Sequence, residues 1–260
     1  MYISVRDATK KYIRKTKTGK EKVTVLDHIS LDVKKGEFIC LLGPAGCGKS
    51  TLLNAMAGFE KLSEGKIEIQ GKEVKNPSSK YVTIFQNYGL LPWRTVLKNI
   101  ELGLEPLQIP RAERHKKAEE YLELVGLGSY AHQYPCQLSG GQQQRVAIAR
   151  GLVVNPEILF MDEPFGALDA ITRIKLQDDL LRITKKQNKT VIFVTHDIEE
   201  AVFLADRIVI MSANPGKIKS ILTVSLGKHR DRTAGDFLNV RDKVFEIFNM
   251  KMEDKIEYII

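Results

Sequence analysis

A glycine-rich loop between an apolar run and a helical segment constrains this chain most. Residues 43–51 read Gly-Pro-Ala-Gly-Cys-Gly-Lys-Ser-Thr, a full match to the pattern G-x-x-x-x-G-K-[ST]. The apolar run Phe38–Leu42 precedes the loop, and the helical run Leu52–Ala57 follows it. Glycines let successive backbone N–H groups turn towards phosphate oxygens, and a helix that begins there adds the positive end of its dipole. The motif therefore predicts a phosphate-binding loop.

Two polar side chains of this loop suit a nucleoside triphosphate. Lys49 adds a positive charge beside the β- and γ-phosphates, and the Ser50 hydroxyl is a ligand for Mg²⁺. A glycine-rich turn without a ligand is the alternative reading of the motif. The nucleotide-binding residues predicted in the loop are Gly43, Pro44, Ala45, Gly46, Cys47, Gly48, Lys49, Ser50 and Thr51.

A second candidate site is an acid pair, Asp162 and Glu163, which ends the apolar run Ile158–Met161. Adjacent residues of an extended strand point to opposite sides, so the two carboxylates can take different roles. We expect Asp162 to hold Mg²⁺ and Glu163 to polarise a water molecule for attack on the γ-phosphate. An exposed acid pair at a strand end is the alternative. The pair Asn188-Lys189 lacks the Asp of a guanine-reading motif, so ATP is the expected nucleotide.

Short apolar runs alternate with longer helical patterns after residue 36, which favours an α/β fold with a parallel sheet covered by helices. Period-two alternation nearer the start of the chain indicates an antiparallel β flank. Between Gln86 and Pro156, helical spacing in Arg111–Val125, with Gly126 as the stop of that helix, indicates a mostly helical insert of about 60 residues. The predicted strands are Glu37–Leu42, Tyr81–Phe85, Ile158–Met161, Val191–Thr195 and Arg207–Met211, with Tyr2–Val5, Val23–Val33 and Lys66–Gln70 in the flank.

Composition excludes several other classes of protein. The 260 residues include 40 Lys and Arg, 32 Asp and Glu, and 43% hydrophobic residues, which excludes disordered, collagen-like and disulfide-scaffold chains. No run reaches the roughly 18 apolar residues of a membrane-spanning helix, so we expect a cytosolic chain. Cys40, Cys47 and Cys136 are expected to be reduced thiols that bind no metal. The basic stretch Lys10–Lys22 is interpreted as a solvated turn between two strands, with contact to nucleic acid or anionic lipid as the alternative.

The segment Leu138-Ser139-Gly140-Gly141-Gln142 separates the classes of protein that share the first two motifs. It precedes the helical run Val146–Val153, and a serine with two glycines at a helix start forms another surface that attracts anions. On these residues the chain resembles the nucleotide-binding subunit of an ATP-binding cassette (ABC) transporter, whose signature is L-S-G-G-Q. The resemblance implies a P-loop NTPase (RecA-like) core with a mostly parallel sheet, an antiparallel β flank and a helical subdomain.

The resemblance also implies roles for residues outside these motifs. Gln86 resembles the glutamine that reaches Mg²⁺ and the attacking water, and His196 resembles the switch histidine that contacts the γ-phosphate. Asp169 resembles a loop residue that touches the opposite subunit. Tyr12 is the best candidate for the aromatic residue that stacks on adenine, although Tyr2 and Tyr81 could also stack. The signature residues implied to contact ATP are Ser139, Gly140, Gly141 and Gln142.

Partners and domains follow from the same resemblance. It implies a homodimer in which two ATP molecules are held head to tail, each between Lys49 and Ser50 of one chain and the signature of its mate. It implies membrane permease subunits as partners, an extracytoplasmic solute-binding protein as an indirect one, and a position on the cytoplasmic face of a bacterial membrane. Residues 1–230 would form the nucleotide-binding domain, with the helical subdomain at about 88–155, and residues 231–260 a peripheral helical extension.

The segments that begin at Gln86, Asp162 and Thr195 resemble the importers of nitrate, sulfonate and taurine, with related uptake of bicarbonate or thiamine precursors. Leu90-Leu91-Pro92-Trp93 contains the only Trp and is expected to dock a short helix of a membrane partner. In the alternative, Trp93 anchors the helical insert in its own core. Two other functions stay open: a soluble ABC-type ATPase acting on nucleic acid or ribosomes, although no nucleic-acid partner is expected, and an exporter or lipid-transport ATPase subunit.

Overall fold

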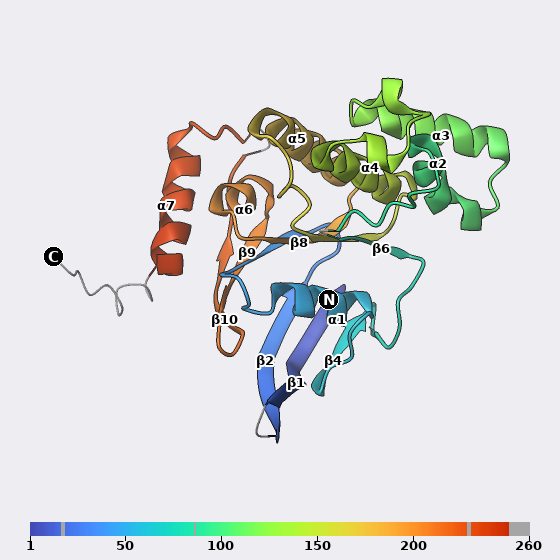
Figure 1. Cartoon of the computed structure of the whole chain (residues 1–260). Helices are drawn as coiled ribbons and strands as arrows, with labels where there is room; N and C mark the ends of the chain where they lie inside the picture. The colour runs from blue at the N-terminus through green and yellow to red at the C-terminus, as the bar shows by residue number, and fades with distance from the viewer. Residues whose placement is uncertain (17–18, 86, 228–229, 250–260) are drawn as a thin grey trace. The chain divides into compact units, whose positions relative to one another are not determined.

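The computed structural model describes residues 1–16, 19–85, 87–227 and 230–249 (Figure 1). The chain divides into two compact units. The first comprises Met1–Pro77 and Ile192–Ile260, and the second comprises Ser78–Val191. Among the described residues, no helix has the length and apolar character needed to cross a membrane.

A four-stranded antiparallel sheet forms one part of the first unit, in the order β2-β1-β4-β5. Strands β1 (Ile3–Thr16) and β2 (Gly19–Val33) form a long hairpin (Figure 1). Strand β4 (Glu64–Ile69) pairs with β1, and β5 (Lys72–Glu73) pairs with β4. Apolar side chains of one face are buried, which gives the unit part of its core.

The predicted turn over Lys10–Lys22 is wrong, because the described residues of this stretch, 10–16 and 19–22, belong to the two strands of the hairpin. Pairing continues from Lys10 opposite Leu26 to Thr16 opposite Gly19. The side chains from Lys11 to Lys15 are all exposed. A strand with both faces in solvent has no alternation of apolar and polar residues, so the pattern that identifies strands in a sequence is missing here.

The first unit also contains the strand that leads into the glycine-rich loop. Strand β3 (Phe38–Leu42) is completely buried and pairs in parallel with β9 (Arg207–Ser212), and β10 (Lys217–Thr223) pairs antiparallel with β9. Strand β8 (Thr190–Thr195) is the other neighbour of β3. The helices of this unit are α1 (Lys49–Ala57), α6 (Ile198–Leu204) and α7 (Gly235–Asn249), and α6 packs against both β3 and α7.

The second unit combines two parallel strands with most of the helices. Strand β6 (Tyr81–Ile84) pairs in parallel with β7 (Ile158–Asp162). Helices α2 (Val96–Glu101), α3 (Arg111–Leu124) and α4 (Gly140–Val153) pack against one another (Figure 1). The remaining elements are the 3₁₀ helices η1 (Leu102–Leu107), η2 (Gly128–Tyr130) and η3 (Pro135–Gln137) and helix α5 (Ala170–Lys186).

The five strands predicted for the parallel sheet are confirmed, since no predicted end differs from the observed one by more than one residue. Helix α3 stops before Gly126, whose φ of 68° suits the predicted helix end. The division into residues 1–230 and 231–260 stays a prediction.

Candidate functional site

The glycine-rich loop of the first unit lies between β3 and α1, as the motif predicts. Gly48 caps α1 with φ 90° and Gly46 has φ 75°, a left-handed conformation that glycine adopts without strain. A Cβ on Gly48 would lie 2.7 Å from the Leu26 side chain, and one on Gly43 would lie 2.9 Å from the Met211 carbonyl oxygen. The backbone of the loop is therefore packed tightly from behind, while Pro44, Ala45 and Gly46 are exposed.

Lys49 extends its ammonium group into this loop. Its Nζ donates to the carbonyl oxygens of Gly43 at 2.7 Å and Pro44 at 2.9 Å, and only 6% of the residue is exposed. Burial raises the pKa of the neighbouring Cys47 thiol, although the Lys49 charge acts in the opposite direction. The loop thus holds a buried cation at the start of a helix whose first turn has no acidic residue, which is an arrangement that attracts phosphate.

Tyr12 of β1 lies close to the first turn of α1. Its hydroxyl forms side-chain hydrogen bonds with Glu60 and Thr51, and burial, followed by the Glu60 charge, raises the pKa of Tyr12. The residue is 39% exposed. Because Thr51 follows Ser50 in the loop motif, the aromatic ring lies within the same part of the first unit as the phosphate loop. Tyr2, one of the alternatives, is 8% exposed and has less surface available for stacking.

His196 follows β8, the neighbour of β3, and it is exposed. The residues directly before and after His196 are hydrogen-bonded. Thr195 Oγ1 donates to Glu200 Oε2 at 2.7 Å, and the Asp197 amide donates to Thr195 Oγ1 at 3.0 Å. Asp197 in turn caps α6 by accepting from the Glu200 amide at 3.1 Å. Sequence analysis missed Glu200, although an acid three residues after a helix cap is a recognisable capping pattern.

The acid pair lies at the end of β7 in the second unit. Strand β7 is buried up to Met161 and ends at Asp162, and both acids are half-buried. Glu163 has φ 44°, a left-handed conformation that costs a non-glycine residue about 1 kcal/mol or more. The expected alternation of side chains therefore does not apply to Glu163, because the strand has already ended.

The signature segment begins helix α4. Ser139 Oγ accepts from the Gln142 amide at 3.3 Å, and Gln142 Oε1 accepts from the Ser139 amide at 2.9 Å, so the two residues form a capping box. Ser139 and Gly140 are exposed. A Cβ on Gly141 would lie 3.2 Å from the Ala167 carbonyl oxygen, and one on Gly140 would lie 2.8 Å from the Tyr88 hydroxyl. The glycines thus allow close packing of neighbouring segments on the helix start.

Asp169 caps helix α5. Its Oδ1 accepts from the Thr172 amide at 3.0 Å, and this hydrogen bond lowers the pKa of Asp169. Gly141 lies beside Ala167 and Leu168. The structure therefore brings the signature and the loop before Asp169 together within the second unit.

Gln86 lies outside the described residues, but the segment after it is held by two residues that sequence analysis missed. Arg150 of α4 donates to the carbonyl oxygens of Gly89 at 2.7 Å and Tyr88 at 2.9 Å, and burial lowers the pKa of its guanidinium. Asn99 of α2 is fully buried and donates to the carbonyl oxygens of Leu91, Arg94 and Thr95. Their signal in the sequence is weak, since a lone Arg or Asn in a helix is common.

Trp93 projects from the turn that Asn99 holds. It is 71% exposed, so the interpretation of Trp93 as an anchor of its own core is wrong. Leu107 at the end of η1 and Phe85 after β6 are also exposed, at 46% and 42%. Trp is enriched at protein–protein interfaces, so the exposed Trp93 marks a candidate docking surface.

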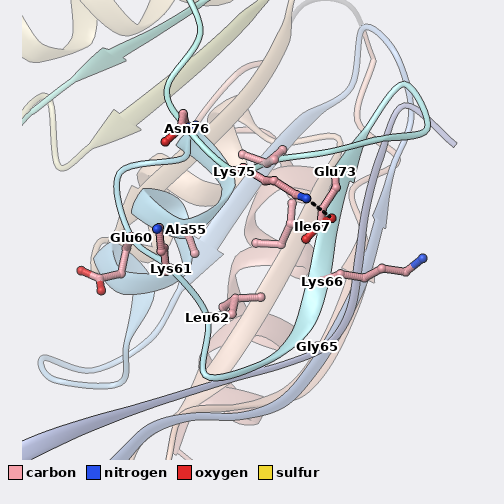
Figure 2. Close-up of a pocket in the computed structure, with 11 residues that line it drawn as sticks. Ala55, Glu60, Lys61, Leu62, Gly65, Lys66, Ile67, Glu73, Lys75 and Asn76 are labelled. Atoms are coloured by element: carbon pink, nitrogen blue, oxygen red, sulfur yellow. Dashed lines mark ion pairs between the residues drawn. The ribbon is translucent and has the colours of Figure 1, made fainter.

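A pocket of about 410 Å³ lies beside the other end of α1 (Figure 2), and none of its lining residues belongs to the glycine-rich loop. Leu62 and Ile67 contribute apolar lining, and Glu73 pairs with Lys75 at 3.3 Å. Figure 2 shows the Glu60 carboxylate and the Lys66 ammonium pointing away from the pocket. Its polar groups do not converge on one point, so we assign no ligand to it.

Comparison with known proteins identifies the family. The family model described as "ABC transporter" matches residues 26–166. An uncharacterised ABC transporter ATP-binding protein of Methanocaldococcus jannaschii is 52% identical over 226 residues, which are 87% of this chain and 85% of that protein. The aliphatic sulfonates import ATP-binding protein SsuB of Bacillus cereus is 44% identical over 95% of this chain and 96% of its own.

A second relative and a solved structure support the same family. The bicarbonate transport ATP-binding protein CmpD of Synechococcus elongatus is 45% identical over 89% of this chain and 83% of its own. A dimeric ATP-binding cassette solved in a post-hydrolysis state with ADP and phosphate has 35% identity and a TM-score of 0.78, over 86% of this chain and all of that one. The predicted fold class is confirmed. The chain belongs to the ABC transporter family and is the ATP-binding ATPase subunit of such a transporter.

Proposed function

We propose that this chain energises an importer of a small solute of the nitrate, sulfonate, taurine or bicarbonate class. The use of ATP is supported by the position of the Lys49 ammonium, which is buried in the glycine-rich loop against the Gly43 and Pro44 carbonyl oxygens. A triphosphate offers that cation better partners than two neutral carbonyl groups. Support for import comes from the relatives SsuB and CmpD, whose names describe sulfonate import and bicarbonate transport.

Hydrolysis would use Glu163, His196 and Lys49. Glu163 accepts a proton from a water molecule while the oxygen of that water attacks the γ-phosphorus. The bond between the γ-phosphorus and the β–γ bridging oxygen then breaks, which gives ADP and phosphate. His196 contacts the γ-phosphate, and Lys49 neutralises charge on the β- and γ-phosphates. The strained backbone of Glu163 is consistent with a side chain whose direction matters for chemistry.

Magnesium fits the residues proposed to hold it. Ser50 offers an exposed hydroxyl in the first turn of α1, Asp162 offers a half-buried carboxylate at the end of β7, and Gln86 completes the proposed set. Mg²⁺ prefers oxygen ligands and usually takes only one or two from protein, with phosphate and water supplying the rest. When bound, the ion neutralises charge that develops on the β- and γ-phosphates. In the described residues, no three His, Cys, Asp or Glu side chains cluster as a separate metal site.

Two copies of the chain would share each ATP. The capped start of α4 presents Ser139 and Gly140 to solvent, and a helix start with an exposed serine and glycine suits the γ-phosphate of an ATP held by the loop of a second copy. Asp169 would approach the partner near the same site. Because these contacts need the γ-phosphate, ATP would favour the closed dimer and hydrolysis would open it.

The permease would dock on the exposed turn that carries Trp93. Arg150 and Asn99 tie this turn and the segment after Gln86 to helices α4 and α2. Helix α4 also begins at the signature, so closure on ATP could move the turn as part of one helical body. An exposed Trp with aliphatic neighbours suits a short apolar helix of a membrane protein. The chain would then work on the cytoplasmic face of the membrane.

The decisive experiment reconstitutes the chain with the membrane subunits encoded by neighbouring genes. Uptake of radiolabelled nitrate, taurine, an alkanesulfonate and bicarbonate into vesicles would be measured with internal ATP, and Glu163→Gln would serve as the inactive control. We expect uptake of one of these solutes that depends on ATP and on Glu163. ATP hydrolysis without uptake of any of them would contradict the solute class and leave the ATPase assignment intact.

A further inference from the structure

The ammonium group of Lys10 lies over the aromatic ring of Tyr12. Its Nζ is 4.8 Å from the ring centroid, within the range of a cation–π interaction. The same Nζ forms an ion pair with Glu60 and donates to the Lys61 carbonyl oxygen at 2.6 Å. Only 12% of the Lys10 side chain is exposed. This lysine is therefore held in one position, unlike the exposed lysines further along the hairpin.

Glu60 connects the lysine to the other end of the tyrosine. Its carboxylate accepts from the Tyr12 hydroxyl, which in turn accepts from the Thr51 side chain. One acid thus pairs with the cation above the ring and binds the hydroxyl at its edge. The ring is thus contacted on one face by the ammonium and at its edge by the two hydroxyl partners.

A glycine at the end of α1 places Glu60 where it can make both contacts. Gly58 has φ 84°, and a Cβ there would lie 2.5 Å from the Asn76 carbonyl carbon. The chain reverses at this glycine, so that the Glu60 amide reaches back to the Asn54 carbonyl oxygen at 3.2 Å. Asn54 is one helical turn from Thr51. The loop after α1 therefore folds back along the helix towards its first turn.

We propose that Lys10 and Glu60 are positioning residues for the nucleotide base. They hold the Tyr12 ring with one face under the ammonium and leave the opposite face for adenine. This inference rests on the proposed role of Tyr12 in stacking on adenine. A fixed ring loses less conformational entropy when the base binds, and a cation on one face draws electron density from the ring, which favours stacking of an electron-rich purine on the other.

Lys10→Met tests this, because it removes the ammonium and keeps the aliphatic stem. Binding of ATP is compared with binding of inorganic tripolyphosphate, which has the phosphates but no base. We expect the Kd for ATP to rise about 3–10-fold, while the Kd for tripolyphosphate and the kcat of ATP hydrolysis change less than about 2-fold. Lys10→Arg should restore ATP binding, since guanidinium also stacks on aromatic rings. Lys11→Met is the matched control, since Lys11 pairs with Glu64 at 2.6 Å.

Two results would overturn the proposal. Equal weakening of ATP and tripolyphosphate would mean that Lys10 acts on the phosphates by charge, and unchanged ATP binding would mean that it does not position the ring. Tyr12→Ala tests separately whether Tyr12 stacks on adenine at all. If Tyr12→Ala also leaves ATP binding unchanged, Tyr12 is not the stacking residue. If it weakens ATP binding and Lys10→Met does not, only the positioning role is wrong. Thermal unfolding of each variant checks that the hairpin remains folded.

Discussion

Asn99 and Leu91 exchange two hydrogen bonds: the Leu91 amide donates to Asn99 Oδ1 at 2.8 Å, and Asn99 Nδ2 donates to the Leu91 carbonyl oxygen at 3.1 Å. The amide side chain of Asn99 thereby pairs with the backbone of Leu91 as a neighbouring strand would. Its remaining bonds, to Arg94 and Thr95, close the turn around Trp93. A fully buried polar group thus fixes an exposed apolar side chain.

Asn99→Ala should loosen this turn. The variant removes the side-chain partner of the Leu91 amide and of the Arg94 carbonyl oxygen, which costs about 1–3 kcal/mol of unfolding free energy. The carbonyl oxygens of Leu91 and Thr95 keep their backbone donors, the amides of Arg94 and Asn99. Trp93 is the only Trp, so its fluorescence reports on the turn directly. We expect lower steady-state anisotropy and a lower urea midpoint. Asn87→Ala is the control, since Asn87 is exposed in the same segment; an equal effect of both variants would contradict the role of Asn99.

Trp93→Ala should separate hydrolysis from coupling. Because Trp93 is largely exposed, its removal should change the unfolding free energy by no more than about 0.5 kcal/mol and leave ATP hydrolysis by the isolated chain unchanged. Binding to the membrane subunits should weaken by about 2 kcal/mol or more, as for a central aromatic interface residue. The measurement is copurification with those subunits in detergent. Full binding by the variant would remove Trp93 from the proposed interface.

Lys49→Ala should weaken nucleotide binding itself. The ammonium is buried in the loop, and a charge-assisted hydrogen bond contributes about 1.5–3 kcal/mol, so ATP affinity should fall by roughly 10–150-fold. Isothermal titration with ATP and Mg²⁺ measures this. Lys66→Ala removes the same charge from an exposed Lys66–Glu68 pair and should leave affinity unchanged. Equal affinities of the two variants would argue against the loop as the phosphate site.

Glu163→Gln should retain ATP binding and lose turnover. Glutamine is similar in size and cannot accept the proton of the attacking water, so kcat should fall by roughly 10²–10⁴-fold. The Kd for ATP should change little, because Glu163 acts on water and not on the phosphates in the ground state. Near-normal phosphate release would show that another group is the base.

Much of this architecture could be predicted from the sequence because the chemistry is local. The motif around Lys49 needs consecutive residues between a strand and a helix, and the apolar runs of the parallel strands have a clear length and end. The capping box of Ser139 and Gln142 is likewise encoded within four residues.

The contacts that join distant parts of the sequence could not be predicted. The pairing of Lys10 with Glu60 spans 50 residues, and that of Arg150 with Tyr88 spans 62. Both depend on the tertiary fold, and neither leaves a spacing pattern in the sequence. The hairpin around Lys15 was missed for a different reason: its exposure on both faces removes the alternation that identifies a strand.

The cap of α5 should make stability depend on pH. A hydrogen bond from the Thr172 amide lowers the pKa of Asp169 below its ordinary value of 3.8. A depressed pKa in the folded state gives stability that is present above the unfolded pKa and is lost as pH falls through the folded value. Asp169→Asn keeps a capping side chain without the charge. The difference in urea midpoint between wild type and Asp169→Asn should therefore shrink as pH falls from 5 to below about 3. A difference that stays constant over this range would contradict a contribution of the Asp169 charge to stability.

Variants of Ser139 distinguish a helix cap from a contact with ATP. Asn and Asp both cap helices about as well as Ser, so Ser139→Asn and Ser139→Asp should have similar urea midpoints to wild type. Only Asp places a negative charge where the γ-phosphate of an ATP on the second copy is proposed to lie. In the Glu163→Gln background, which prevents hydrolysis, we expect ATP to produce a dimer of the Asn variant and only monomer of the Asp variant by size-exclusion chromatography with light scattering. ATP binding to the Asp monomer should be normal, because Lys49 is untouched. A stable ATP-bound dimer of the Asp variant would place the signature away from the triphosphate and contradict the shared site.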